Sequence, residues 1–292
     1  MHKPMKSGEV LAELHKQGRL PVIPDTLQRF ESIWRDPHKH MTELATIITE
    51  NAEISKRIIN TANSVMHRGD VNVENASQAI GRLGVIEARN VVHAVSLHDA
   101  FTSPYVDPKK FWRHSITSAF AARKIAEYMI KRFKWEIDPQ LAFLAGLVHD
   151  AGIVLMSRFF RADYEAVRDA AHSLDEFITL ENQTLHMTHS ILGAALFQHW
   201  HLPSEIIMGV AGHHNPSRVH ADHYQIAYVT CLAEGAAWLL NESNGFFPSH
   251  PDKTSATLIE NLKLERLTMD HLKFLAKQAQ DDSESSSMIC MF

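Results

Sequence analysis

The sequence predicts an all-α protein, and three observations lead to this prediction. Apolar residues recur at spacings of three and four along most of the 292-residue chain, as on one face of a helix. No segment alternates apolar and polar residues with the period of two that marks a half-buried strand. Prolines and glycines fall between the periodic segments, where they end helices. We therefore expect a helical protein with two lobes, residues 1–105 and residues 106–292.

The first lobe is expected to contain several short helices. A leading helix over residues 1–18 is followed by the connector LPVIPDT, in which two prolines favour an extended chain. Helices are expected next over residues 27–35, 42–51 and 52–63. Residues 75–95, NASQAIGRLGVIEARNVVHAV, predict two further helices joined at Gly84.

This last pair has the outline of a helix-turn-helix, so DNA binding has to be weighed. Its second helix would offer Glu87, Arg89, Asn90 and His93 to a DNA duplex. No basic cluster flanks these residues to bind phosphates, and the formal net charge of the chain is −5. We therefore favour plain helix packing and expect no nucleic-acid partner.

The second lobe begins after the clearest break in the chain, residues 103–108, where two prolines lie close together. Helices are expected in FWRHSITSAFAARKIAEYM, AFLAGLVHD, IVLMSRFF and residues 164–171, and then in LENQTLHMTHSILGAALFQHW, PSEIIMGVAGHH, residues 222–240 and residues 254–280. A polar tail, DDSESSS, precedes the apolar end MICMF, whose role stays open.

Composition narrows the cellular context. We find no run approaching the roughly 18 apolar residues of a membrane span, and the first residues, MHKPMKSGEV, lack the apolar segment of a signal peptide. Cys231 and Cys290 cannot build a disulfide framework and are interpreted as reduced thiols. We therefore expect a cytoplasmic protein without a membrane partner.

Histidine is the unusual residue, with 20 copies, so position must separate ligands from surface residues. Seven residues of the second lobe lie at helix ends or on faces of small apolar residues: His114, His149, Asp150, His189, His213, His214 and Glu234. Imidazole and carboxylate groups are ligands for iron, manganese, zinc or nickel, and one carboxylate can bridge two ions. A single buried histidine is more often a hydrogen-bonded core residue, but so many in one lobe favour a site for one or two divalent metal ions.

Other histidines and other kinds of functional site have weaker support in the sequence than the metal site. The remaining histidines of this lobe are expected to be surface or capping residues: His186, His199, His201, His220 and His223. The chain contains no GxSxG motif, no phosphate-binding glycine-rich loop and no dinucleotide-binding motif.

The order of these residues resembles the HD-domain superfamily of metal-dependent phosphohydrolases. The first lobe narrows the resemblance, because LPVIPDTLQRFESI, ISKRIINTANSVMHRG and NASQAIGRLGVIEARNVV are similar to segments of the HDOD family, the HD-related output domain. The resemblance covers nearly the whole chain. It implies an all-helical, two-lobed bacterial signalling protein, for most members of which no catalytic activity is established.

The resemblance also implies roles for single residues. His114, His149, Asp150 and Glu234 correspond to the first metal set of an HD site. His189, His213 and His214 correspond to the extra ligands of members with two metals, which share Asp150.

Two positions depart from the pattern. Glu234 stands in an LAE context where the superfamily usually has LAD, and Ile153 stands where the related phosphodiesterases carry lysine. The GYP segment of those phosphodiesterases is also missing.

We therefore expect a regulatory module that acts through contacts with partner proteins and keeps a metal pocket. The alternative is a metal-dependent phosphohydrolase, in which a metal-activated water attacks a phosphorus centre and Asp150 with His213 or His214 takes part in catalysis. Its ligand would be a phosphorylated small molecule or a nucleotide. The sequence leaves open the metal's identity, the partner protein and the oligomeric state.

Overall fold

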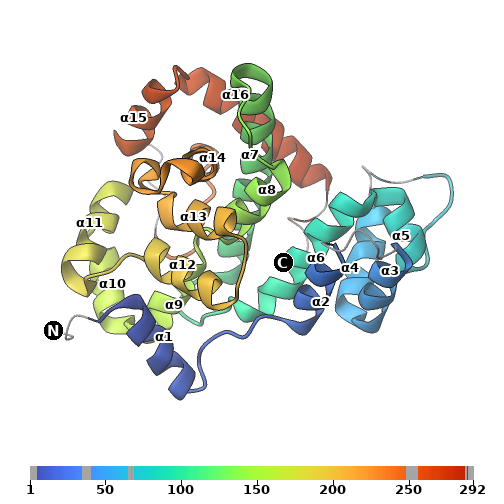
Figure 1. The fold of residues 1–292 in the computed structure, drawn as a ribbon, viewed down its shortest axis with the longest axis horizontal. Coiled ribbons are helices and arrows are strands. Elements are labelled where there is room, and N and C mark those ends of the chain that lie inside the picture. Colours follow the sequence, from blue (N-terminus) through green and yellow to red (C-terminus); the bar gives the residue numbers. More distant parts are fainter. Residues whose placement is uncertain are drawn as a thin grey trace. The chain divides into compact units, whose positions relative to one another are not determined.

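The structure, a computed structural model, describes residues 5–34, 41–64, 67, 69–247, 256–286 and 288. These residues form helices, turns and loops without a β-strand, which confirms the predicted all-α class (Figure 1). The chain divides into two compact units. The larger unit comprises Met1–Leu20 and Thr102–Gln280, and the smaller comprises Pro21–Phe101 and Asp281–Phe292.

The smaller unit is built from five helices within its described residues. They are α2 (Asp25–Trp34), α3 (Met41–Glu50), α4 (Ala52–Ala62), α5 (Ala76–Leu83) and α6 (Val85–Ala100). Asparagine side chains begin two of them, because Asn51 accepts a hydrogen bond from the amide of Ile54 and Asn75 accepts one from the amide of Gln78. The two helices on either side of Gly84, which has a φ of 78°, are therefore confirmed.

Burial excludes the DNA-reading role considered for α6. Arg89, Asn90 and His93 are only 5%, 2% and 1% exposed. The guanidinium of Arg89 donates two hydrogen bonds of 2.8 Å to the carboxylate of Glu31 on α2, and Nε2 of His93 lies 2.7 Å from the same carboxylate. These side chains join two helices inside the unit, so they are unavailable to base edges, as the packing interpretation requires.

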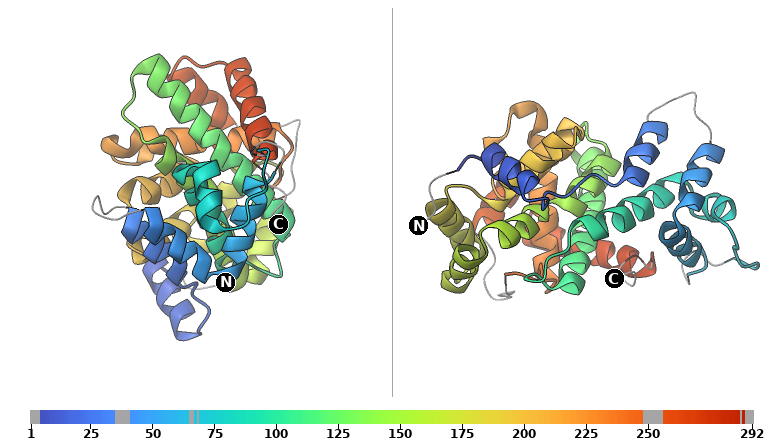
Figure 2. Two further views of the ribbon diagram at one scale, coloured as in Figure 1. Left: turned by 90° about the vertical axis from the view of Figure 1, so that its right-hand side faces the viewer. Right: turned by 90° about the horizontal axis from the view of Figure 1, so that it is seen from below.

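The larger unit carries the remaining helices. They are α1 (Ser7–Lys16), α7 (Pro108–Phe133), α8 (Pro139–Val148), α9 (Ala151–Phe159), α10 (Arg161–Ala170), α11 (Leu174–Leu185), α12 (His189–His199), α13 (Ser204–Gly212), α14 (Tyr224–Leu239), α15 (Ala256–Leu264) and α16 (Met269–Ser285), with short 3-10 turns at Pro216–Arg218 and Ala221–His223. Figure 2 shows α1 lying beside α12, which it contacts. The helix α16 continues beyond Gln280, where the assignment to the larger unit ends.

The core of the larger unit surrounds α8. This helix packs against α7, α13 and α14, while α12 packs against α9 and α13. Asp138 starts α8 by accepting a hydrogen bond from the amide of Gln140, with Pro139 in the first turn. The dyad His149-Asp150 forms a turn between α8 and α9, so it lies at the end of the helix that packs against α7, α13 and α14.

One apolar stretch was overlooked in the sequence. Pro139–Phe159, 21 residues with a mean hydropathy of 1.5 over its best window, is long and apolar enough to cross a membrane by length and composition alone. That window is 89% buried inside the unit, as expected for core helices, and the turn at His149-Asp150 interrupts it.

Both terminal segments are described only in part. The predicted leading helix is confirmed over Ser7–Lys16, and its first four residues lie outside the described residues. Cys231 is a free, buried thiol, as predicted, whereas Cys290 and the MICMF end apart from Met288 lie outside them.

Candidate metal centre

The structure brings all seven predicted side chains together inside the larger unit. They come from α7 (His114), the turn before α9 (His149 and Asp150), the start of α12 (His189), the end of α13 (His213 and His214) and α14 (Glu234). Three overlapping groups have ligand atoms within 4.8 Å of one another: His114 with His149 and Asp150, His189 with His213 and His214, and Asp150 with His213 and Glu234.

Asp150 lies at the centre of this cluster and is 1% exposed. Its Oδ2 lies 3.6 Å from Nε2 of His114 and 3.4 Å from Nε2 of His149. Its Oδ1 faces the other side, 3.3 Å from Nε2 of His189 and 3.8 Å from Nε2 of His213. Oδ1 is fully buried, and among the described residues the nearest donor that could serve it is Nε2 of His189, which can donate only when that ring is protonated. A buried anionic oxygen in this setting needs a positive charge beside it, either a metal ion or a protonated imidazole.

Backbone carbonyls fix the tautomers of three histidines. Nδ1 of each ring is hydrogen-bonded to a carbonyl oxygen: Glu242 for His114 (2.7 Å), Gly146 for His149 (2.8 Å) and Val210 for His213 (2.6 Å). A carbonyl only accepts hydrogen bonds, so Nδ1 carries the proton and Nε2 of the neutral ring presents a lone pair. Burial lowers the pKa of His114 and His213, which keeps these rings neutral.

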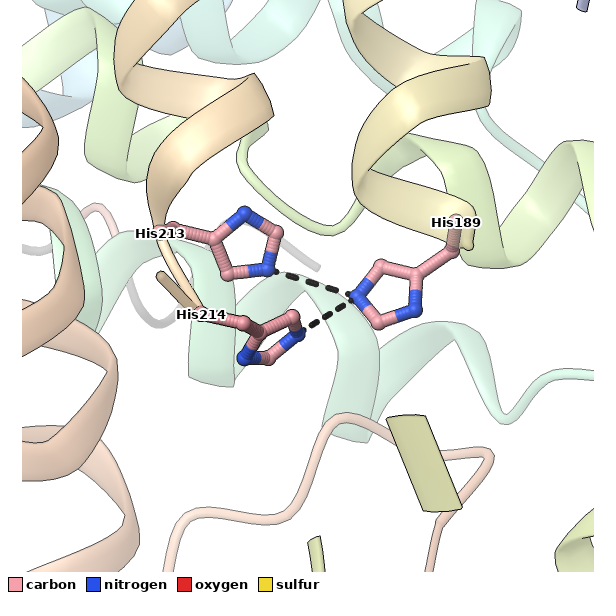
Figure 3. Close-up of side chains that lie close together, drawn as sticks. All are labelled: His189, His213 and His214. Carbon is pink, nitrogen blue, oxygen red and sulfur yellow. Dashed lines mark hydrogen bonds between the residues drawn. The ribbon is translucent and has the colours of Figure 1, made fainter. Parts of the chain in front are cut away.

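The Nε2 atoms of these rings point toward one another. The Nε2 atoms of His114 and His149 lie 3.3 Å apart. Nε2 of His189 lies 3.3 Å from that of His213 and 2.9 Å from that of His214 (Figure 3). Two lone pairs at such distances repel unless a proton or a metal ion lies between them. Rings that donate from Nδ1 to an oxygen and converge through Nε2 are the usual arrangement of metal-binding histidines. The donor set therefore fits divalent metal ions.

His189 has a partner that sequence analysis missed. Its Nδ1 donates to both oxygens of Glu181, at 2.8 and 2.9 Å, and Glu181 is fully buried on α11. The hydroxyl of Tyr164 donates to the same carboxylate at 2.8 Å. Burial disfavours the charged imidazole, but the carboxylates of Glu181 and Asp150 outweigh burial and raise the pKa of His189 to about 10. Without a metal, a proton on Nε2 of His189 supplies the positive charge of this group.

Glu234 lies with the second group of histidines. Its Oε2 is 3.2 Å from Nδ1 of His214, and its Oε1 accepts a hydrogen bond of 3.3 Å from Nε1 of Trp238. Burial and the charge of Asp150 raise the pKa of Glu234 to about 7. The resemblance implied that Glu234 belongs with His114 and His149, whereas the geometry groups it with Asp150 and His213.

A cavity of about 1410 Å³ in the larger unit reaches one side of the cluster. His213, His214 and Glu234 line it, while the walls are contributed mainly by α11, α12, α13 and α14. Leu174, Ile178 and Met208 make part of its lining apolar, and Lys6 and Arg218 add positive charge. His114 and His149 do not line the cavity and are fully buried. A ligand in the cavity would therefore meet the second histidine group first.

A second missed residue is Asn244. Its Nδ2 donates a hydrogen bond of 3.0 Å to Oδ2 of Asp150, and the side chain is 1% exposed. Neither Asn244 nor Glu181 carries a local signal, because Asn244 stands in the loop-like NESNGFF and Glu181 stands among polar residues. Their partners lie 94 and 8 residues away in the chain and meet them only in the folded unit.

We expect metal affinity to rise with pH between about pH 7 and pH 10. A metal ion at Nε2 of His189 must displace the proton that the raised pKa, about 10, holds there. Glu234, with a pKa of about 7, is half ionised at pH 7 and becomes almost fully ionised from about pH 8 upward. The apparent affinity for Co²⁺ should rise about tenfold per pH unit, with about one proton released per ion. Calorimetric titration at several pH values in buffers of different ionisation enthalpy measures both. A constant affinity over this range would contradict the expected proton displacement.

Comparison with known proteins identifies one family model that matches most of the chain. The sequence model of the HDOD domain matches residues 20–216. A protein of Treponema pallidum with no assigned role is 21% identical over 206 residues, which cover 67% of this chain and 38% of that protein. This chain thus spans well under half the length of that relative.

Two solved structures share the fold at low identity. A protein of Shewanella amazonensis named as a proposed phosphohydrolase is 19% identical, with a TM-score of 0.71 and 97% of each chain covered. A protein of Marinobacter aquaeolei named for a proposed role in signal transduction is 20% identical, with a TM-score of 0.72, covering 100% of this chain and 62% of that one.

Proposed function

This chain belongs to the HDOD domain family, and from that premise we propose that it is a bacterial regulatory module that binds metal ions and acts through contacts with partner proteins. The convergent Nε2 atoms around Asp150 are the observation that carries the metal-binding part. The name of the Marinobacter protein supports the regulatory part. We propose that residues 106–292 hold the metal and that the module works in the cytoplasm.

The ligands proposed for the metal ions are the seven residues of the cluster. His114 and His149 would bind on one side of Asp150, and His189, His213, His214 and Glu234 on the other. Iron, manganese, zinc and nickel all accept such nitrogen and oxygen ligands. A bound ion would supply positive charge and Lewis acidity to a ligand in the cavity. The chain itself contributes the fixed tautomers and the oriented carboxylate.

Ile153 supports a regulatory role over catalysis. It stands where the similar phosphodiesterases carry a lysine, and it is fully buried. A buried aliphatic side chain offers no charge to hold a phosphate. This position therefore lacks a group that phosphodiester hydrolysis would use.

A metal-dependent phosphohydrolase is the second candidate, and the cavity favours it. The cavity connects His213, His214 and Glu234 to Arg218, whose guanidinium could bind a phosphate. The name of the Shewanella protein points the same way. In this alternative the substrate is a phosphorylated small molecule or a nucleotide, and Asp150, His213 and His214 take part in the reaction.

Metal analysis combined with a turnover assay tests the proposal. We expect protein purified without chelator to carry about one to two divalent ions per chain, and we expect His149→Ala and Asp150→Ala to lose them. His199→Ala, an exposed residue at the other end of α12, is the matched control and should keep the metal. With added manganese, we expect no turnover of phosphomonoesters, nucleotides or cyclic dinucleotides.

Two results would change this conclusion. Turnover of any of these substrates that is lost in Asp150→Ala would establish the phosphohydrolase alternative. Wild-type protein that stays free of metal after addition of iron, manganese, zinc and nickel would overturn both candidates.

A further inference from the structure

The segment that follows α14, Asn241–Phe247, contacts both sides of the histidine cluster. It lies beyond residue 216, where the match to the HDOD domain ends. The backbone carbonyl of Glu242 accepts the hydrogen bond from Nδ1 of His114, at 2.7 Å. The carboxylate of Glu242 is itself held by Arg113 of α7, whose Nε lies 2.7 and 2.8 Å from its two oxygens. One ligand of the cluster therefore owes its tautomer to this segment.

Asn244 makes the second contact, and both ends of its amide are fixed. Its Oδ1 accepts hydrogen bonds from the backbone amides of Phe246 (3.3 Å) and Phe247 (2.9 Å). A backbone N–H only donates, so the oxygen of the side-chain amide must face these two groups and the NH₂ must face away from them. The NH₂ group then donates to Oδ2 of Asp150 at 3.0 Å. This hydrogen bond links the segment directly to the carboxylate at the centre of the cluster.

A third contact reaches the other histidine group through stacked rings. Phe246 stacks on Tyr164, with ring centroids 4.5 Å apart and an interplanar angle of 12°. The hydroxyl of Tyr164 donates to Glu181, which in turn accepts from Nδ1 of His189. The segment therefore packs against the tyrosine whose hydroxyl donates to the carboxylate partner of His189.

The backbone of the segment is anchored at Gly245. Its carbonyl accepts a hydrogen bond of 3.0 Å from the amide of Asp107, the residue that begins α7. Its φ of +74° lies in the left-handed region, and a Cβ atom built there would lie 2.4 Å from the carbonyl oxygen of Asp107. Only glycine fits this turn, so the turn is tied to the start of the helix that carries His114.

We propose that Glu242–Phe247 is the positioning turn of the metal centre and that Asn244 is a positioning residue that orients Asp150 for metal binding. This inference rests on the proposed metal-binding function and adds a residue outside the matched domain. Asp150 needs both carboxylate oxygens aimed in opposite directions to serve the two histidine groups. The hydrogen bond from Asn244 holds Oδ2 toward His114 and His149, which leaves Oδ1 facing His189.

Two substitutions separate this role from simple support of the turn. Asn244→Ala removes both the oxygen that accepts from the amides of Phe246 and Phe247 and the NH₂ group that donates to Asp150. Asn244→Ser keeps a hydroxyl that can accept from the amides of Phe246 and Phe247, as serine does in many turns. That hydroxyl ends one bond closer to the backbone than the NH₂ group, so it does not reach Asp150.

Asn261→Ala is the matched control. Asn261 is also buried, at 4% exposed, and its Nδ2 donates to Sγ of Cys231 at 3.2 Å, away from Asp150. The experiment titrates Co²⁺ into metal-free full-length protein and records the dissociation constant and the visible absorption of the bound ion. Unfolding in urea, measured without metal, reports the cost to stability of each substitution.

We expect both Asn244 variants to bind Co²⁺ about 10- to 100-fold more weakly than wild type, with an altered visible spectrum. The Asn261→Ala variant should keep the wild-type affinity and spectrum although it loses stability. Wild-type Co²⁺ affinity in Asn244→Ser would overturn the positioning role of Asn244. This variant tests the role even if Asn244→Ala does not fold. Failure of wild-type protein itself to bind Co²⁺ would overturn the proposed metal-binding function together with this inference.

Discussion

Replacing Gly152 with alanine is expected to destabilise the larger unit by about 3 kcal/mol or more and to weaken metal binding strongly. A Cβ atom at this position would lie 1.9 Å from the carbonyl oxygen of His189 and 3.0 Å from the amide nitrogen of Gly193. Both neighbours are backbone atoms, which cannot move away by a change of rotamer as a side chain can. The close approach of α9 and α12 therefore depends on this glycine.

The expected effect on the metal has the same origin. His189 is the first residue of α12, and Gly152 follows Asp150 by two residues. Any shift of α12 that admits the new methyl group moves Nε2 of His189 away from Oδ1 of Asp150, now 3.3 Å distant. The packing of two helices and the geometry of the site are thus coupled at one residue.

Urea denaturation of the metal-free protein and a Co²⁺ titration measure the two effects of Gly152→Ala. Gly81→Ala is the control, because Gly81 lies inside α5 and a Cβ there meets no described atom within 4 Å. That substitution should be neutral or stabilise by up to about 1 kcal/mol, as expected for alanine in a helix. A Gly152→Ala protein with wild-type stability and wild-type Co²⁺ affinity would show that α9 and α12 do not pack as described.

The helices could be predicted because their signals are local. Leu27 and Phe30 mark the buried face of α2, and Asp138-Pro139 starts α8 as a cap followed by a proline in the first turn. The length of the apolar stretch Pro139–Phe159 was missed for a related, local reason. Polar residues at its centre, His149 and Asp150, divide the apolar run in the sequence, although the window as a whole passes the test for a span.

The ligand candidates could also be predicted, because each histidine stood at a helix end or beside small apolar residues. Their partners could not be predicted, since these pairings depend on the tertiary fold. Asn244 meets Asp150 across 94 residues, and Arg89 meets Glu31 across 58. The same limit explains why α6 suggested a DNA-reading helix: its polar residues are hydrogen-bonded to a helix that the local sequence does not reveal.

Replacing Glu181 with alanine is the other substitution with a large expected effect. The carboxylate is fully buried and accepts hydrogen bonds from Tyr164 at 2.8 Å and from Nδ1 of His189 at 2.8 Å. Its removal leaves a buried imidazolium and a buried hydroxyl without their acceptor, which should cost about 3–5 kcal/mol of the free energy of unfolding in the metal-free protein.

Metal binding should weaken as well in Glu181→Ala. The hydrogen bond from Nδ1 fixes the ring orientation and the tautomer that leaves Nε2 free for an ion, so its loss should lower Co²⁺ affinity about 10- to 100-fold. Tyr164→Phe is the matched control, because it removes only the hydroxyl that donates to Glu181 and keeps the ring that stacks on Phe246. That variant should lose about 1 kcal/mol and keep nearly the wild-type affinity.

Comparison of the two variants separates the hydrogen bond of Glu181 with His189 from its hydrogen bond with Tyr164. Equal losses of Co²⁺ affinity in Tyr164→Phe and Glu181→Ala would assign the effect to the hydrogen bond between the Tyr164 hydroxyl and Glu181. Wild-type affinity in Glu181→Ala would show that the bond between Glu181 and His189 does not orient a ligand. A selective loss in Glu181→Ala would make this carboxylate part of the metal centre, since it acts on the ion through the ring of His189.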